Sequence, residues 1–243
     1  MKTAIFLQAR LNSTRLPKKI LMKIKKKTII EIIIERLLDK KKKIDLIVLT
    51  SVSKSDRFLI KFLKNKNIKY FAGSENDVLS RFYYAAKKKN ISTIIRCNGD
   101  CPFLEIKLIR KMLKIYKKKK IDYLSNILVP RFPSGMHVEI FNFKSLENAF
   151  LNAKKKFERE HVTPYIYNNS KKFKIFKYFI KKDYSMHRWT IDYVEDFIFV
   201  KKIISILGLK NLTMYKILNL IRKNPKLKKI NYQIPKKQNL LKK

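Results

Sequence analysis

The chain has 243 residues, of which 46% are hydrophobic, so it is long enough and apolar enough to fold around a buried core. It carries 59 Lys and Arg against 18 Asp and Glu, a formal net charge of +41, but this hydrophobic content excludes a disordered polycation. No apolar run reaches the roughly 20 residues of a membrane-spanning helix, and the N-terminus lacks the pattern of a secretory leader. The sequence therefore predicts a soluble protein of the cytoplasm.

Alternating strands and helices are predicted over the first half of the chain. Short β-branched runs predict strands at Lys2–Gln8, Ile44–Thr50, Ile68–Phe71, Ser92–Cys97 and Ile121–Asn126. Longer periodic segments between them predict helices at Thr28–Leu38, Lys54–Lys66, Asn76–Lys89 and Glu105–Lys117. This alternation is typical of a mostly parallel sheet with helices on both of its faces.

From about Val129 the pattern changes, and we interpret the second half as further strands added to the same sheet. The expected elements are strand Val138–Phe143, helix Ser145–Lys156, strands Lys174–Ile180 and His187–Ile191, and helices Tyr193–Leu207 and Met214–Arg222. Residues 224–243 are polar and Lys-rich. We therefore predict a single domain over residues 1–223 and a loosely held tail over residues 224–243.

The large positive charge has two explanations. It could mark a surface that binds nucleic acid, because a strong positive field attracts polyanions. The chain also has 48 lysines but only 11 arginines and 4 glycines, which indicates a composition drawn toward lysine as a surface residue. We favour solvated faces, because lysine runs such as Lys87–Lys89 and Lys117–Lys120 lack the interleaved aromatic residues of a nucleic-acid surface.

In a chain that favours lysine, the few arginines indicate positions where the geometry of a guanidinium is needed. Those near the few glycines or in polar stretches are Arg10, Arg15, Arg81, Arg96, Arg131, Arg159 and Arg188, whereas we expect Arg36, Arg57, Arg110 and Arg222 on helix surfaces. Cys97 and Cys101 have no companion pair with which to bind a metal, so we interpret them as packing thiols.

The loop after the first strand, residues 9–19, concentrates cations and small hydrogen-bond donors. Arg10, Arg15 and Lys19 stand there together with Ser13. Arginine forks phosphate oxygens and lysine acts as a point charge, so this loop suits a triphosphate. It lacks the glycines of a P-loop or of a dinucleotide fingerprint, and an ordinary basic loop is the alternative.

Two acids, Asp100 and Asp192, each follow a predicted strand, at the edge where open α/β sheets bind ligands. Mg²⁺ at nucleotide sites uses one or two carboxylates together with the phosphates of the substrate. We therefore expect the two carboxylates to converge and to bind Mg²⁺ opposite the cationic loop. The alternative is that each is a turn or capping residue, as we expect of Glu195 and Asp196.

Six segments along residues 1 to about 205 form an ordered pattern. They are Gln8-Ala9-Arg10 with Ser13-Thr14-Arg15-Leu16-Pro17 and Lys19, Gly73-Ser74 with Asp77-Val78-Leu79-Ser80-Arg81-Phe82, Gly99-Asp100-Cys101-Pro102, Arg131 with Pro133 and Gly135, Arg159-Glu160-His161-Val162-Thr163-Pro164-Tyr165, and Arg188-Trp189-Thr190 with Asp192 and Glu195-Asp196. In this order they resemble the cytidylyltransferase family typified by spore coat polysaccharide biosynthesis protein F. That family is related to the enzymes that activate 3-deoxy-manno-octulosonate and acylneuraminate as CMP-sugars.

The resemblance implies a nucleotide-diphospho-sugar transferase (GT-A-like) fold, a mixed, mostly parallel sheet sandwiched by helices. It also implies a Mg²⁺-dependent cytidylyltransferase that transfers CMP from CTP to a sugar, a nonulosonate or a related surface-polysaccharide sugar, and releases pyrophosphate. By the same resemblance, the catalytic residues are Arg10, Lys19, Asp100 and Asp192, of which the two acids hold the metal. The nucleotide-binding residues are Arg10, Ser13, Arg15, Lys19, Ser80 and Arg81, and the sugar-binding residues are Arg131, Glu139, Arg159, Glu160 and His161. Two positions depart from the family pattern: Lys18 replaces the usual glycine, and His137 replaces an acidic residue.

Two other functions stay open at this point. A glycosyltransferase on the same fold would consume a nucleotide-sugar, usually with an Asp-x-Asp metal pair, and no Asp-x-Asp occurs in the chain. A basic nucleic-acid-binding protein would account for the charge, although the acids at the strand ends weigh against it. We expect CTP and a sugar as partners, no specific nucleic acid and no membrane span, and the resemblance leaves a homodimer open.

Overall fold

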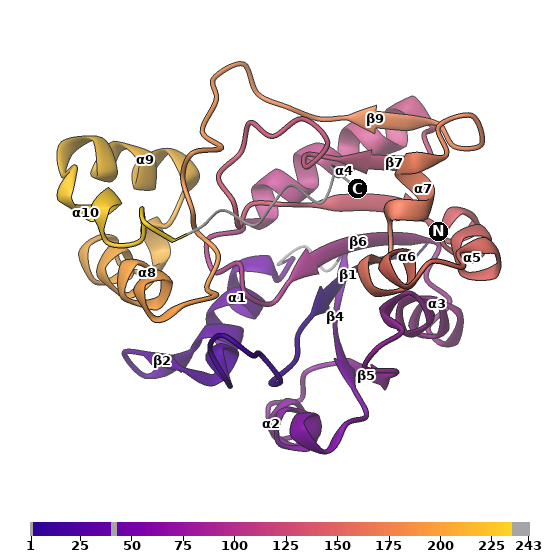
Figure 1. Cartoon of the computed structure of the whole chain (residues 1–243), viewed down its shortest axis with the longest axis horizontal. Helices are drawn as coiled ribbons and strands as arrows, with labels where there is room; N and C mark the ends of the chain where they lie inside the picture. The colour runs from indigo at the N-terminus through magenta and orange to yellow at the C-terminus, as the bar shows by residue number, and fades with distance from the viewer. Residues whose placement is uncertain (1, 40–42, 235–243) are drawn as a thin grey trace.

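A seven-stranded mixed sheet runs through the molecule in the computed structural model, which describes residues 2–39 and 43–234 (Figure 1). Its strands lie in the order β5-β4-β1-β6-β8-β7-β9. They are β1 (Thr3–Gln8), β4 (Asp45–Ser51), β5 (Tyr70–Gly73), β6 (Thr93–Asn98), β7 (Tyr123–Ser125), β8 (Glu139–Asn142) and β9 (Ile175–Lys177). Strand β8 is antiparallel to both of its neighbours and every other pair is parallel, which confirms the predicted mixed, mostly parallel sheet.

Helices cover both faces of this sheet. Successive residues of each strand point to opposite sides, so the apolar strands supply a core on each face. Ile5 and Leu7 of β1 pack in one core with α1, α4, α8 and α9, whereas Ala4 and Phe6 pack in a second core with α3, α5 and α7. The helices are α1 (Ile29–Leu37), α2 (Arg57–Asn65), α3 (Val78–Lys88), α4 (Ile106–Lys119), α5 (Phe143–Asn152), α6 (Lys156–His161), α7 (Pro164–Asn168), α8 (Val194–Leu207), α9 (Met214–Lys223) and α10 (Lys226–Lys229).

Most predicted elements are present, with boundaries set by local capping. Thr28 caps α1: its side chain accepts a hydrogen bond from the backbone N–H of Glu31, whose carboxylate accepts one from the N–H of Thr28. Gly208 ends α8 with φ of +70°, a conformation that side chains rarely adopt. The short helices α6 and α7 and the hairpin of β2 (Lys23–Ile24) and β3 (Lys27–Thr28) were not predicted.

The predicted strand His187–Ile191 is wrong. This segment is extended, but it crosses the carboxyl ends of the strands instead of joining the sheet. Its one bridge pairs Arg188 with Ser134, and the backbone N–H of Ile191 donates to the carbonyl of Asp100 at 2.9 Å. The apolar run is therefore explained by burial of Trp189 and Ile191 under the C-terminal helices and not by a strand ladder.

The expected loose tail is also wrong over the part that the structure describes. Residues 226–229 form α10, the side chain of Leu227 is 7% exposed, and that of Asn231 is 6% exposed. Figure 1 shows α10 packed beside α8 and α9 at one end of the molecule. The remainder of the predicted tail, residues 235–243, lies outside the described residues.

The order in which successive strands are added to the sheet reverses at β1: β4 and β5 lie on one side of β1, and β6 lies on the other. Ligands of α/β proteins bind at such switch points, beyond the carboxyl ends of the strands. Gln8 and Asn98 pair at those ends, and the N–H of Gly99 donates to the carbonyl of Gln8 at 2.8 Å. A Cβ at Gly99 would lie 2.9 Å from the Cβ of Ala9, so glycine allows the two following loops to leave the sheet in contact.

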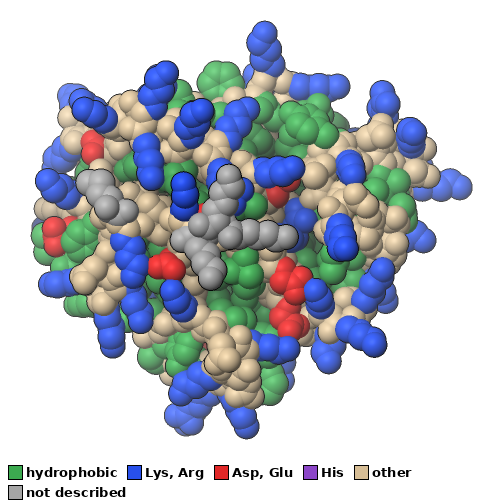
Figure 2. Space-filling model, turned by 180° about the vertical axis from the view of Figure 1, so that it is seen from behind, with side chains coloured by type: hydrophobic (Ala, Val, Ile, Leu, Met, Phe, Trp, Pro, Cys, Tyr) green, Lys and Arg blue, Asp and Glu red, His purple; other side chains and the backbone are tan. Residues whose placement is uncertain are grey.

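The surface is strongly basic without a single basic stripe on the face that Figure 2 shows, where Lys and Arg side chains are scattered among neutral and hydrophobic ones. Between residues 2 and 234, leaving out residues 40–42, no helix has the length and the apolar character needed to cross a membrane.

Gly135 is expected to be more sensitive to substitution than Gly208, although both have positive φ. At Gly135 φ is +98°, and a Cβ would lie 2.7 Å from the carbonyl carbon of Trp189, whereas nothing lies within 4 Å at Gly208. We expect Gly135→Ala to lower the free energy of unfolding by about 3 kcal/mol and Gly208→Ala by about 1 kcal/mol. Guanidinium denaturation followed by the fluorescence of Trp189, the one tryptophan of the chain, measures both losses. Equal losses would contradict a steric role for the contact with Trp189.

Candidate active site

A cavity of about 340 Å³ opens at the carboxyl ends of β1 and β6. One side is the loop after β1, and the opposite side is formed by α6. Its lining residues are Gln8, Ala9, Arg10, Asn12, Ser13, Thr14, Arg15, Lys19, Ile20, Val78, Arg96, Asn98, Gly99, Asp100, Glu160, His161 and Asp192. A cavity therefore lies where the site was predicted, at the loops that follow the carboxyl ends of the strands.

Asp100 and Asp192 converge in this cavity, as predicted. The ammonium Nζ of Lys19 donates to Oδ2 of Asp100 at 3.1 Å and to Oδ1 of Asp192 at 2.9 Å. It also donates to the carbonyl of Ile191 at 2.5 Å. One cation thus joins three segments that lie far apart in the sequence, and the two carboxylates face each other across it.

Lys19 is held as a cation by these partners. Burial by itself lowers the pKa of Lys19, but the charges of Asp100 and Asp192 and their hydrogen bonds outweigh burial, so the pKa is raised above its usual 10.5. The ammonium therefore stays protonated throughout the physiological range, and the two carboxylates share one positive charge between them.

Asp192 is bound from both sides. Arg15 Nη2 approaches Oδ1 at 2.9 Å from the cavity side, and Arg188 Nη2 donates to Oδ2 at 3.1 Å from the interior. Arg188 also forks the carboxylate of Asp196, at 2.9 and 3.0 Å. Burial lowers the pKa of Arg188, but the hydrogen bonds and charge of Asp196 outweigh burial and raise it. Asp196 was expected only to cap a helix; it also fixes the cation behind Asp192.

The loop after β1 is anchored by a buried acid that the sequence did not reveal. Asp56 is fully buried, and its carboxylate accepts a hydrogen bond from the N–H of Leu11 at 2.7 Å. Further along the loop, Lys18 has φ of +54°. This left-handed conformation is the physical reason why the resemblance expects glycine there. Arg10 and Ser13, which belong to the same loop, line the cavity.

The predicted nucleotide residues Ser80 and Arg81 lie behind the cavity wall. Ser80 is in the first turn of α3, where its N–H and hydroxyl both donate to Asp77. Arg81 is 1% exposed, and burial lowers its pKa to about 10. Its three guanidinium nitrogens have no hydrogen-bond partner among the described residues. The buried guanidinium of Arg81 therefore presents hydrogen-bond donors for which the described residues provide no acceptor.

The five predicted sugar residues separate into two groups. Glu160 and His161, at the end of α6, line the cavity. Arg131 and Arg159 do not: the first approaches Asp183 at 3.6 Å on the surface, and the second pairs with the carboxylate of Asp77. Glu139 does not line the cavity either, and it is 4% exposed. His137, which departs from the family pattern, also lies outside the cavity lining.

Glu139 lies in the interior, where it holds the cavity residue Arg96 in place. Its carboxylate accepts from Arg96 Nη1 at 2.5 Å, from the hydroxyl of Tyr123 at 2.6 Å and from Oγ1 of Thr163 at 2.5 Å. Thr163 follows Val162, a β-branched residue with φ of +72°. Such a conformation costs of order 1–3 kcal/mol and persists where the surroundings impose it. The network thus fixes both Arg96 and the corner that carries His161.

Several functional candidates were not assigned a role from the sequence. Gln8, Asn98 and Arg96 line the cavity, and the scarcity of arginine had singled out only the last of them. Cys97 and Cys101 are buried, and burial raises the pKa of both thiols, in agreement with packing roles.

The arrangement of strands and cavity is that of the nucleotide-diphospho-sugar transferase fold. The structure of CMP:2-keto-3-deoxy-manno-octonic acid synthetase complexed with CTP has a TM-score of 0.62 to this chain, covers 85% of it and 99% of that chain, and is 14% identical, which shows a shared fold. The expected fold class is therefore confirmed.

The chain belongs to the cytidylyltransferase family, whose sequence profile, described as Cytidylyltransferase, matches residues 4–230. A solved structure of a cytidylyltransferase from Leptospira borgpetersenii is 35% identical, covers 98% of this chain and 99% of that chain, and has a TM-score of 0.88. Spore coat polysaccharide biosynthesis protein SpsF of Bacillus subtilis is 28% identical over 90% of this chain and 93% of its own length. The protein is therefore a nucleotidyltransferase of the cytidylyltransferase family, as the motifs predicted.

We expect Lys19→Met to lower the free energy of unfolding by about 3 kcal/mol near pH 7, because two carboxylates lose the cation between them. The folded-state pKa of Lys19 is raised. Its contribution is therefore fully present below a pH of about 10.5 and is lost as the pH rises through the folded pKa. Denaturation at several pH values should show a constant difference between wild type and variant from about pH 7 to 9 and a shrinking one above about pH 10.5.

The control is Lys18→Met, which removes a neighbouring exposed ammonium that lies outside the cavity lining. A difference that already shrinks between about pH 7 and 9 would contradict the assignment of Lys19 as the shared cation.

Proposed function

We propose that the protein transfers CMP from CTP to the hydroxyl of a sugar and releases pyrophosphate. The observation that carries this proposal is the convergence of Asp100, Asp192 and Lys19 in a cavity lined by the cationic loop after β1. The family supports the nucleotide and the class of reaction, and the name of the SpsF relative supports a sugar used for surface polysaccharide.

In this proposal the loop after β1 holds the triphosphate. Arg10 already lines the cavity, and Arg15 and Lys19 exchange their bonds with the acids for bonds with phosphate oxygens. The acceptor hydroxyl attacks the α-phosphorus: a new oxygen–phosphorus bond forms, the bond between the α-phosphorus and the pyrophosphate oxygen breaks, pyrophosphate leaves, and the hydroxyl proton passes to water. Most of the rate enhancement comes from positioning and from cations fixed where negative charge develops.

Asp100 and Asp192 fit Mg²⁺. Their carboxylate oxygens are hard ligands, they converge on one cation, and Mg²⁺ at nucleotide sites needs only one or two carboxylates beside the phosphates. Among the residues that the structure describes, no cluster of three or more His, Cys, Asp or Glu side chains forms a cage for a metal by itself, which suits an ion that arrives with the nucleotide. When bound, Mg²⁺ would neutralise charge on the phosphate oxygens.

Arg81 would read the nucleobase. It lies one helical turn from Val78, which lines the cavity, and its buried guanidinium presents donors that lack an acceptor among the described residues. Cytosine offers two adjacent acceptors, O2 and N3, whereas uracil has a donor at N3. A guanidinium therefore matches cytosine and not uracil.

The acceptor sugar would bind at the end of the cavity formed by Glu160, His161 and Arg96. A carboxylate and an imidazole can hydrogen-bond hydroxyl groups, and the guanidinium can bind an anionic group of the sugar. A nonulosonate or a related acidic sugar meets both requirements.

We expect Asp100→Asn to lower kcat at least about 100-fold, because the variant keeps the shape of the side chain and removes a principal charge of the site. The assay incubates the protein with each nucleoside triphosphate, Mg²⁺ and a panel of nonulosonates and phosphosugars, and scores pyrophosphate. Asp45→Asn is the matched control. Asp45 is the first residue of β4, at the amino-terminal end of the strands and therefore away from the cavity, and it pairs with Lys69. Near wild-type turnover by Asp100→Asn would remove Asp100 from the site.

We expect Arg81→Met to weaken the preference for CTP over UTP about tenfold, because a bidentate contact to a base discriminates by about 1–3 kcal/mol. Titration calorimetry with either nucleotide and Mg²⁺ measures this preference without an acceptor. The same variant should keep or raise Tm, since it removes buried donors that have no hydrogen-bond partner in the described part of the chain. An unchanged preference in a folded variant would contradict the role of Arg81.

A further inference from the structure

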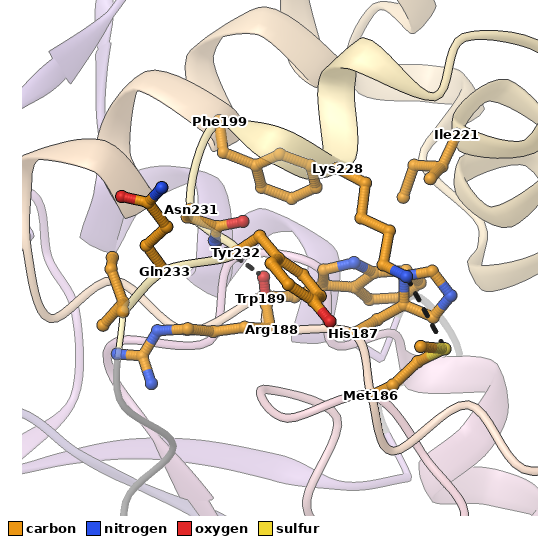
Figure 3. Close-up of a pocket in the computed structure, with 11 residues that line it drawn as sticks. Met186, His187, Arg188, Trp189, Phe199, Ile221, Lys228, Asn231, Tyr232 and Gln233 are labelled. Carbon is orange, nitrogen blue, oxygen red and sulfur yellow. Dashed lines mark hydrogen bonds between the residues drawn. The ribbon is translucent and has the colours of Figure 1, made fainter.

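The segment after α9 reaches back to the residues that support the active site. Residues 186–189 and 228–234 enclose a second cavity of about 340 Å³, and Figure 3 shows Asn231 on one side of it bonded to Arg188. Asn231 is 6% exposed in a segment where Tyr232 is 64% exposed. One asparagine of a polar, Lys-rich segment is thus selectively buried.

The amide of Asn231 has a fixed orientation. Its Nδ2 donates to the carbonyl of Arg188 at 3.0 Å and to Oδ1 of Asp196 at 2.9 Å. Both partners are acceptors, so only the NH₂ side of the amide satisfies them. An aspartate at this position would place a second carboxylate against Asp196 with nothing to donate.

Asp196 connects Asn231 to Asp192 through hydrogen bonds. It is fully buried, and its Oδ2 accepts from the backbone N–H of Asp192 at 2.9 Å and from that of Tyr193 at 3.1 Å. Both of its oxygens accept from Arg188, whose Nη2 also binds Oδ2 of Asp192 at 3.1 Å. With Oδ2 held from the interior, Asp192 directs Oδ1 toward Lys19 and Arg15 in the cavity.

We propose that Asn231 is a positioning residue for Asp192, acting through Asp196 and Arg188. The C-terminal segment is then part of the catalytic unit, although its described residues, up to residue 234, contribute none to the cavity lining. A group that orients a metal-binding carboxylate from behind typically accounts for 10–100-fold in metal affinity or activity. This inference rests on the proposed function, because it assumes that Asp192 holds the ion that accompanies CTP.

The test measures metal binding separately from turnover. Mn²⁺, as a probe for Mg²⁺, is titrated into the full-length protein with a CTP analogue that has a methylene between its α- and β-phosphorus, and free Mn²⁺ is counted by electron paramagnetic resonance. We expect Asn231→Ala to raise the Kd for Mn²⁺ about tenfold and to lower kcat about tenfold, with KM for CTP within about twofold of wild type. We expect Asn231→Asp to lose at least as much.

Two further variants complete the design. Asn224→Ala is the matched control: this asparagine lies in the same segment, is exposed, and donates only to the carbonyl of Leu220. It should bind Mn²⁺ like wild type. Asn231→Ser keeps one hydroxyl donor for one of the two acceptors, so it should fall between Asn231→Ala and wild type, and it carries the test if Asn231→Ala does not fold.

The outcomes separate this inference from the proposed function. If wild type retains Mn²⁺ and releases pyrophosphate but the Asn231 variants bind Mn²⁺ equally well, the positioning role is overturned and the function stands. A lowered Tm with an unchanged Kd for Mn²⁺ also overturns it, because Asn231 would then only anchor the segment. If wild type neither retains Mn²⁺ nor releases pyrophosphate, the proposed function fails and this inference fails with it.

Discussion

The ammonium of Lys19 is the interaction on which the site depends. Asp100 and Asp192 belong to segments that the fold brings together only at the edge of the sheet, and two carboxylates at such proximity repel each other unless a cation lies between them. Lys19 supplies that cation from a third segment. Two glycines allow these segments to approach one another. Gly99 lets the loops after β1 and β6 touch, and Gly135 lets the segment before Asp192 pass close to the backbone of the loop before β8.

The other end of the cavity is built on a different principle. There a buried carboxylate, that of Glu139, gathers donors from β6, β7 and the corner between α6 and α7. This network holds Arg96 at the cavity and fixes the strained Val162 beside His161. One end of the site is thus ordered by a shared cation and the other by a shared anion, with the strand ends of β1 and β6 between them.

The sequence predicted the sheet and most helices, because strand–helix alternation fixes where strands end. The meeting of Asp100 with Asp192 was predicted from a strand at His187–Ile191 that the structure does not have. The two acids meet because the extended segment before Asp192 lies against the loop after β6, where the N–H of Ile191 donates to the carbonyl of Asp100. The resemblance assigned Glu139 to the sugar, whereas the structure buries its carboxylate at the start of β8, where Arg96, Tyr123 and Thr163 donate to it. These donors come from three separate segments, so no local pattern in the sequence could show that they meet at Glu139. The scarcity of arginine singled out Arg96 and Arg188, but only the contacts show what they hold. Arg36, expected on a helix surface, instead donates to two backbone carbonyls. Asn231 could not be found, because nothing in a polar segment distinguishes the one side chain that turns inward.

Counted over the residues that the structure describes, the ion cluster around Asp192 is electrically balanced. Three carboxylates, those of Asp100, Asp192 and Asp196, meet three cations, those of Lys19, Arg15 and Arg188. A neutral cluster exerts little force on a distant polyanion, so the long-range attraction for a nucleotide comes from the excess positive charge on the rest of the molecule. That field fades over a Debye length of about 8 Å at physiological salt. In the proposed function, encounter with the nucleotide is therefore governed by the lysine-rich exterior and by ionic strength, whereas retention is governed by the few cations that line the cavity.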